Sequence, residues 1–146
     1  MELAAGLGAD AQRDFDLVRA QQRLLGASGV NTDAEIAIFE ADHGHADRAV
    51  RLARRGYAAA PSVRSADALG WALTRAGRPV EGLAYARRAL RLGSRDALFL
   101  YHAGTAARAA GRRGLARGLL SSALAANPSF SPLHAPAARR ALRGLR

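Results

Sequence analysis

The sequence predicts an all-α protein in which pairs of antiparallel helices stack side by side. Ala, Leu and Arg dominate the composition and favour helices, whereas β-branched and aromatic residues are few. Apolar residues recur at helical spacing in successive segments. The glycines between these segments, Gly44, Gly77 and Gly111, are 33 and 34 residues apart, and a fixed period of this length is typical of stacked helical repeats.

The expected helices follow one another along the whole chain. Residues 1–9 are rich in Gly and Ala and are expected to fray, and a helix is expected from about Asp10 to Leu25, with a break at 26–29. Three helix pairs follow, each divided by one periodic glycine, at 34–43 and 48–60, 65–76 and 79–92, and 96–110 and 113–126. A last short helix is expected to begin near Pro136.

Small residues recur at two positions of each second helix. Five residues after each periodic glycine come Ala49, Gly82 and Ala116, and twelve residues after it come Gly56, Ala89 and Ala123. Small residues at fixed places allow two helices to approach closely, and a single hairpin cannot bury its apolar face alone. Neighbouring hairpins are therefore expected to share one continuous core.

This pattern resembles tetratricopeptide repeats (TPRs). The resemblance also rests on the pairs Ile36-Ala37, Leu69-Gly70 and Ala103-Gly104 and on the helix ends at Pro61, Ser94 and Pro128, although Ser94 departs from the terminal Pro of the family. It implies a right-handed superhelical α-solenoid with repeats at 30–62, 63–96 and 97–130. Residues 1–29 would form an N-terminal tail and capping helix, and residues 131–146 a C-terminal capping helix. The segments IFEADHG and NPSFSPLHAPAARRAL resemble the C-terminal part of actinobacterial multi-TPR proteins, so the chain is expected to be a piece or a short version of a larger array.

The resemblance also implies a binding surface. In this family the exposed face of the first helices lines a concave groove that holds peptides. The groove residues implied here are Arg64, Asp67, Trp71, Arg75, Tyr101, His102, Thr105 and Arg108, with Asn31, Ala34, Ile38, Ala41 and Asp42 from the first repeat. Aromatic residues and Arg are enriched at binding hot spots. The alternative is that Trp71 and Tyr101 pack between neighbouring repeats.

Charge is distributed unevenly along the chain. Residues 1–73 contain 8 Arg and 10 acidic residues, a net charge of −2, whereas residues 74–146 contain 14 Arg and 2 acidic residues, a net charge of +12. All 22 basic residues are Arg, which is also typical of a high-GC bacterial genome. The asymmetry indicates an anionic partner for the second half, or a neighbouring acidic domain.

The residue pattern gives little support for chemistry. The chain has no Cys, its acidic residues are scattered, and His43 and His45 lack further metal ligands at helical spacing. We therefore expect no enzyme activity, no metal and no cofactor, and we expect His134 to be structural or solvated. The sequence has no signal peptide pattern and no apolar run of the ~18–20 residues that a membrane helix needs, so a cytoplasmic location is the default expectation.

These observations predict a non-enzymatic scaffold or adaptor that binds a protein or peptide segment, with acidic residues, in the concave groove. The first alternative is binding of nucleic acid or another anionic polymer through the basic second half, which the lack of a groove-reading motif and the few aromatics disfavour. The second alternative is that the basic half docks within a larger TPR protein.

Overall fold

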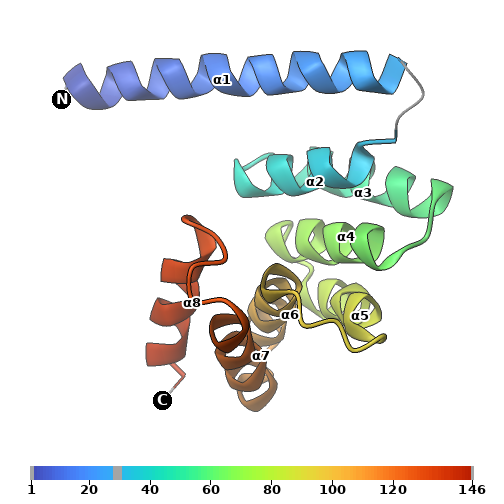
Figure 1. The fold of residues 1–146 in the computed structure, drawn as a ribbon, viewed down its shortest axis with the longest axis vertical. Helices are drawn as coiled ribbons and strands as arrows, with labels where there is room; N and C mark the ends of the chain where they lie inside the picture. The colour runs from blue at the N-terminus through green and yellow to red at the C-terminus, as the bar shows by residue number, and fades with distance from the viewer. Residues whose placement is uncertain (1, 28–30, 146) are drawn as a thin grey trace. The chain divides into compact units, whose positions relative to one another are not determined.

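The computed structural model describes residues 2–27 and 31–145, and in this part of the chain it contains α-helices and no strand. The helices are α1 (Glu2–Ala27), α2 (Asp33–Asp42), α3 (Ala46–Ala59), α4 (Val63–Arg75), α5 (Pro79–Leu90), α6 (Ala97–Ala109), α7 (Arg113–Ala126) and α8 (His134–Arg143). Residues Met1–Thr32 and Asp33–Arg146 form two separate compact units. Figure 1 shows α2 to α7 as successive antiparallel pairs. The predicted all-α stack of hairpins is confirmed.

The first helix is longer than predicted. α1 begins at Glu2, whereas the sequence analysis expected fraying up to residue 9. Ala and Leu alternate with the two early glycines, and each Gly costs a helix only about 1 kcal/mol relative to Ala. Of the expected break at 26–29, residues 26 and 27 still belong to α1, and residues 28 and 29 lie outside the described residues. The capping role of residues 1–29 stays a prediction.

The three hairpins turn in the same way. Gly44, Gly77 and Gly111 have φ angles of +87°, +77° and +76°, a region that favours glycine because it lacks a Cβ atom. The residue after each glycine donates its backbone N–H to a carbonyl five residues earlier, with distances of 2.9, 2.9 and 2.8 Å for His45 to Glu40, Arg78 to Leu73 and Arg112 to Ala107. The three turns therefore share the same backbone conformation and the same hydrogen bond.

Capping residues set where several helices begin. The Ser62 hydroxyl accepts the Ser65 backbone N–H and the Ser65 hydroxyl accepts the Ser62 backbone N–H, so the pair forms a capping box at the start of α4. The Asp96 carboxylate accepts the N–H groups of Leu98 and Phe99 at the start of α6. Pro79 occupies the first turn of α5, where its missing N–H is not needed.

The core is built mainly from small side chains. All six small residues predicted for the second helices are buried, at positions 49, 56, 82, 89, 116 and 123. The closest approach is between α4 and α5, where a Cβ atom added to Gly70 would lie 2.8 Å from the backbone nitrogen of Ala86 and 2.9 Å from the carbonyl oxygen of Gly82. Buried leucines, among them Leu69, Leu73 and Leu120, fill the remaining space. The two backbones of a hairpin therefore touch almost directly.

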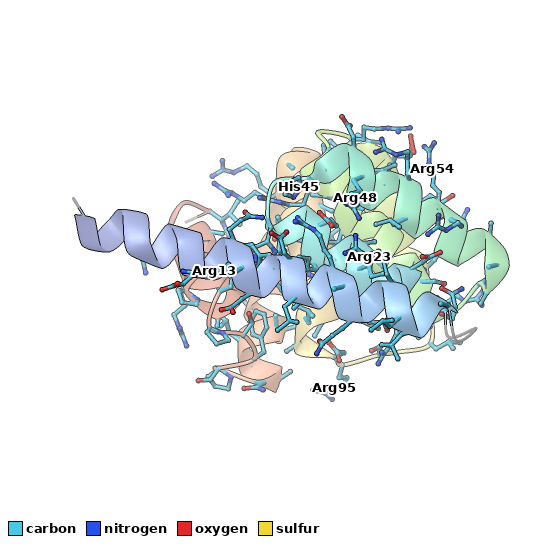
Figure 2. All side chains as sticks on the ribbon, turned by 90° about the horizontal axis from the view of Figure 1, so that it is seen from above. Arg13, Arg23, His45, Arg48, Arg54 and Arg95 are labelled. Carbon is cyan, nitrogen blue, oxygen red and sulfur yellow. The ribbon has the colours of Figure 1, made fainter. Side chains whose placement is uncertain are left out.

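Arginines of the first half connect neighbouring helices. Arg55 on α3 donates two hydrogen bonds of 2.7 Å to Asp33 at the start of α2, and Arg54 pairs with Glu81 on α5 at 3.4 Å. Figure 2 shows Arg48 and Arg54 on α3, with His45 just before this helix. Arg48 and His45 both face Glu40, at 3.4 and 3.1 Å. The Arg54–Glu81 pair is exposed on both sides and contributes at most about 1 kcal/mol, whereas the side chain of Glu40 is fully buried.

The last helix departs from the stack. In Figure 1, α8 runs along the ends of the preceding helices rather than continuing their order. Its C-terminal end is held to α7, because Arg113 donates to the carbonyl of Gly144 at 3.4 Å and Arg117 donates to that of Leu145. It begins at His134, two residues before the predicted start near Pro136.

None of the helices in residues 2–27 and 31–145 combines the length and the apolar character needed to cross a membrane.

The close contact between α4 and α5 can be tested at Gly70. Gly70→Ala is expected to lower the free energy of unfolding by about 1–3 kcal/mol, because the new Cβ atom meets backbone atoms that cannot rotate away. Gly118→Ala on α7 is the matched control, since a Cβ atom there meets nothing within 4 Å, and it is expected to add about 0.5–1 kcal/mol. Urea unfolding measures both variants, and equal effects would contradict the close contact.

Candidate protein-interaction site

The structure divides the eight predicted groove residues into two groups. Asp67, Trp71, Tyr101 and His102 are buried, with exposed fractions of 0%, 2%, 6% and 1%. Arg64, Arg75 and Arg108 are exposed, and Thr105 is half-buried. All eight come from α4 and α6, which pack against each other. The four buried side chains therefore belong to the core, and the three arginines lie at the surface.

Trp71 lies at the centre of the buried group. Its ring stacks on His102, with centroids 4.2 Å apart and an interplanar angle of 15°, and it meets the edge of His134 at 5.5 Å. The ring of Tyr101, on α6 like His102, has its centroid 5.7 Å from that of Trp71. The indole N–H donates to Asp42 Oδ1 at 2.8 Å, so this large ring is both packed and hydrogen-bonded.

Asp42 connects three helices. This last residue of α2 accepts the Trp71 indole N–H from α4, and its Oδ2 atom lies 3.2 Å from His134 Nε2 at the start of α8. Burial acts to raise the pKa of Asp42, but the hydrogen bonds and positive charge of His134, together with the Trp71 N–H, outweigh it and lower the pKa. The native fold therefore favours the ionised carboxylate.

A second carboxylate–imidazole pair lies deeper in the fold. His102 Nδ1 is 2.9 and 3.0 Å from the two carboxylate oxygens of Asp67 and donates its hydrogen to them. His102 Nε2 is buried and has no hydrogen-bond partner among the described residues. An Asp–His pair can orient a general base, but here no hydroxyl or thiol of the described part of the chain lies within hydrogen-bond distance of Nε2. The pair joins α4 to α6.

Tyr101 forms the contact with the C-terminal segment. His134 stacks on it at 4.8 Å and 27°, and Phe130 lies 5.6 Å away. Burial raises the pKa of the Tyr101 hydroxyl, against a hydrogen bond from Thr105 and the nearby positive charges of Arg75 and Arg140, which lower it. The hydroxyl stays neutral at physiological pH.

Two exposed arginines, Arg75 and Arg140, lie near these rings. The Arg75 guanidinium lies 5.6 Å from the centroid of the Trp71 ring, and its Nε–H donates to the carbonyl of Ala41 at 3.3 Å. Arg108 is exposed in the last turn of α6, and Arg140 of α8 is exposed near Tyr101. Arg64 is already paired with Glu35 of α2 at 2.8 Å. We call Arg75, Arg108 and Arg140 the arginine rim.

Phe130, His134 and Arg140 are the members of this site that sequence reasoning did not include. The resemblance placed Asp42 on the same face but gave it no partner, and His134 was expected to be structural or solvated. The segment that contains Phe130 and His134 is flanked by prolines. Prolines are typical of a loop, but they do not show which helices the loop contacts.

The described residues place no three His, Cys, Asp or Glu side chains together in a group able to hold a metal ion.

Comparisons with known proteins concern the fold. No protein-family model and no curated protein sequence matches the chain. The NMR structure of the first TPR domain of the human RPAP3 protein is similar, with a TM-score of 0.58 and 15% sequence identity over 80% of this chain and 97% of that domain. The fold is that of a TPR-type α-solenoid. At this identity the likeness extends to the fold alone, and it agrees with the repeats found in the sequence.

The role of Asp42 predicts a pH dependence of stability. Asp42→Asn is expected to lower the free energy of unfolding at pH 7 by about 1–3 kcal/mol, because it removes a buried charged acceptor. Since the native pKa of Asp42 is lowered, this stabilisation is complete above the unfolded pKa of about 3.9 and is lost as the pH falls through the native value.

Urea unfolding of both proteins between pH 7 and pH 3 measures this difference, which should shrink at the acid end. The exposed Asp47→Asn variant is the control, with an expected change of no more than about 0.5 kcal/mol. A difference that stays constant down to pH 3 would show that the charge of Asp42 is not responsible.

Proposed function

We propose that this chain is a non-enzymatic scaffold or adaptor that binds an acidic segment of a partner protein over the face formed by α2, α4 and α6. The TPR-like fold is typical of protein-interaction modules, and this supports the general class. The observation that supports an acidic partner is the arginine rim: Arg75 and Arg140 are exposed beside the rings, and Arg108 is exposed in the last turn of α6. Guanidinium groups bind carboxylates through paired, charge-assisted hydrogen bonds.

The balance of charge supports the same partner chemistry. Residues 74–146 contain only two acidic side chains, Glu81 and Asp96. Glu81 is engaged by Arg54 and Arg78, and Asp96 caps α6. Neither is therefore available to neutralise the arginine rim, whose charge remains open to a partner.

The buried rings have an indirect role in this proposal. Trp71, Tyr101 and His102 hold α4 and α6 in a fixed arrangement, and Asp42 fixes Trp71 to α2. Side chains that are positioned before binding lose less entropy when a partner arrives. Of the eight groove residues expected from sequence, we retain Arg75 and Arg108 as partner contacts and assign Asp67, Trp71, Tyr101 and His102 to supporting them.

Substitution of the arginine rim tests this proposal. The triple variant Arg75→Ala, Arg108→Ala, Arg140→Ala is expected to bind acidic peptides at least about tenfold more weakly, because it removes three charge-assisted contacts. Fluorescence anisotropy with a panel of labelled Glu- and Asp-rich peptides measures the affinity. The triple variant Arg87→Ala, Arg91→Ala, Arg112→Ala loses the same net charge from exposed positions of α5 and the start of α7, and should retain binding. Equal loss in both variants would exclude the proposed face.

A second candidate function is binding of nucleic acid or another anionic polymer. A hollow of about 330 Å³ between α5 and α7 is lined by Arg87, Arg112 and Arg113, with Leu83, Gly114 and Leu115 completing the wall. The first turn of α7 contributes to this hollow and has no side-chain cap, so its N–H groups add to the positive potential. This observation favours an anionic ligand on the side of the second helices.

Salt dependence distinguishes this candidate. If a duplex DNA or RNA probe binds through the hollow, the logarithm of the affinity should fall linearly with the logarithm of the salt concentration. The variant Arg87→Ala, Arg112→Ala should then reduce the magnitude of the slope by roughly 2, since about 0.9 is lost for each phosphate contact. An unchanged slope in this variant, or binding that does not respond to salt, would exclude the hollow.

The wider setting of the chain stays a prediction. The resemblance to the C-terminal part of actinobacterial multi-TPR proteins supports a bacterial origin and a place in a larger array, where the basic half could dock on an acidic part of the same polypeptide. A cytoplasmic location rests only on the expectation from sequence.

A further inference from the structure

The segment between α7 and α8, residues 127–134, lies against the first helices of the repeats. Its Phe130 ring faces Tyr101 of α6. At its end, His134 stacks on Tyr101, meets the edge of Trp71 on α4, and reaches Asp42 on α2, a residue 92 positions earlier. One short segment thus contacts α2, α4 and α6.

The segment is held there by side chains. Within the described part of the chain, its backbone bonds only to itself and to α7 and α8: Asn127 donates to the Ala123 carbonyl, Ser129 to the Asn127 side chain, His134 to the Ser131 side chain and Ala135 to the Ser131 carbonyl, and Arg139 donates to the Pro128 carbonyl. In residues 31–145 no backbone–backbone bond joins it to α2, α4 or α6. Contacts made by two side chains can open locally at a lower free energy than the unfolding of the whole stack.

Most of the segment remains exposed to solvent. Leu133 is 57% exposed, and Asn127, Pro128, Ser129 and Pro132 are exposed as well. His134, in contrast, is only 7% exposed. The segment turns at 128–129 and 132–133 and buries one side chain, that of His134, while most of its residues stay exposed. A bound peptide likewise holds to a helical surface through a few buried side chains.

We propose that residues 127–134 are a built-in, displaceable occupant of the face formed by α2, α4 and α6. A partner takes their place with an aromatic residue followed four positions later by a His, in a segment whose acidic residues reach the arginine rim. The aromatic ring packs on Tyr101, and the imidazole stacks between Tyr101 and Trp71 and hydrogen-bonds to Asp42. The inference refines the proposed function and rests on it for the statement that this face serves a partner.

The face is thereby kept closed until a competing segment arrives. When the competent state is only fractionally populated, the apparent affinity for a partner falls by that fraction. Weakening the internal contact should therefore strengthen binding of an external segment. On an open surface, in contrast, removal of a contact residue weakens the binding of a partner.

The experiment uses the full chain and a labelled peptide with the sequence of residues 127–134, which leaves out the four arginines of residues 139–146. The His134→Ala chain should bind this peptide at least about tenfold more tightly than the unaltered chain, because its own segment no longer competes. The same peptide with Ala in place of His134 should bind neither chain. Leu133→Ala, at an exposed neighbouring position, is the control chain and should bind like the unaltered one. Equal affinity of the unaltered and His134→Ala chains would overturn the proposal.

Trp71 reports on the same event without any partner, because it is the one Trp of the chain. Its fluorescence in His134→Ala should move to longer wavelength as water reaches the ring, with the helical circular dichroism retained. An unmoved emission in a folded variant would overturn the proposal. These two measurements use no acidic peptide and leave the arginine rim unaltered, so failure of the acidic-peptide proposal and failure of this one are distinguishable.

Hydrogen exchange of the Trp71 indole N–H in the unaltered chain covers the case in which His134→Ala does not fold. This N–H is hydrogen-bonded to Asp42. If the segment opens locally, the N–H should exchange faster than the core amides of α4, and its exchange rate should depend little on denaturant. Exchange only at the rate of global unfolding would overturn the proposal.

Discussion

The structure depends on close approach of the two helices of each hairpin, which at α4 and α5 brings backbone against backbone. At Gly70 and Gly82 there is no room for even one Cβ atom, and the equivalent buried positions elsewhere are Ala or Gly. Helices this close leave little volume for large side chains between them. The larger residues are therefore displaced to the edges of the stack, and the face of the first helices receives most of the rings.

That displacement explains why buried polar groups gather at the same place. The rings of Trp71, Tyr101 and His102 carry N–H and O–H groups that need partners when they are buried. Asp42 and Asp67 supply the acceptors from α2 and α4. A buried carboxylate is costly unless it is hydrogen-bonded, so each acid is matched to a donor on another helix, and the match fixes how adjacent repeats are oriented.

The sequence predicts those parts of the fold whose residues recur at a regular spacing along the chain. Gly44, Gly77 and Gly111 need a positive φ angle at each turn, and the small residues follow at constant distances, so hairpins and core positions were confirmed. The burial of Trp71 was an open alternative, because an aromatic residue suits both a groove and a core. The path of residues 127–134 could not be predicted, since His134 and Asp42 share no local pattern.

Arginine has two distinct physical roles in this chain. In the first half, Arg55 and Arg64 reach acidic residues on neighbouring helices and join them. In the second half almost no acid is present, and the same type of side chain creates repulsion across a net charge of +12. The use of Arg in place of Lys throughout the chain does not account for the scarcity of acids in one half. If an anion binds that half it relieves the repulsion, and binding and the stability of the second half are then linked.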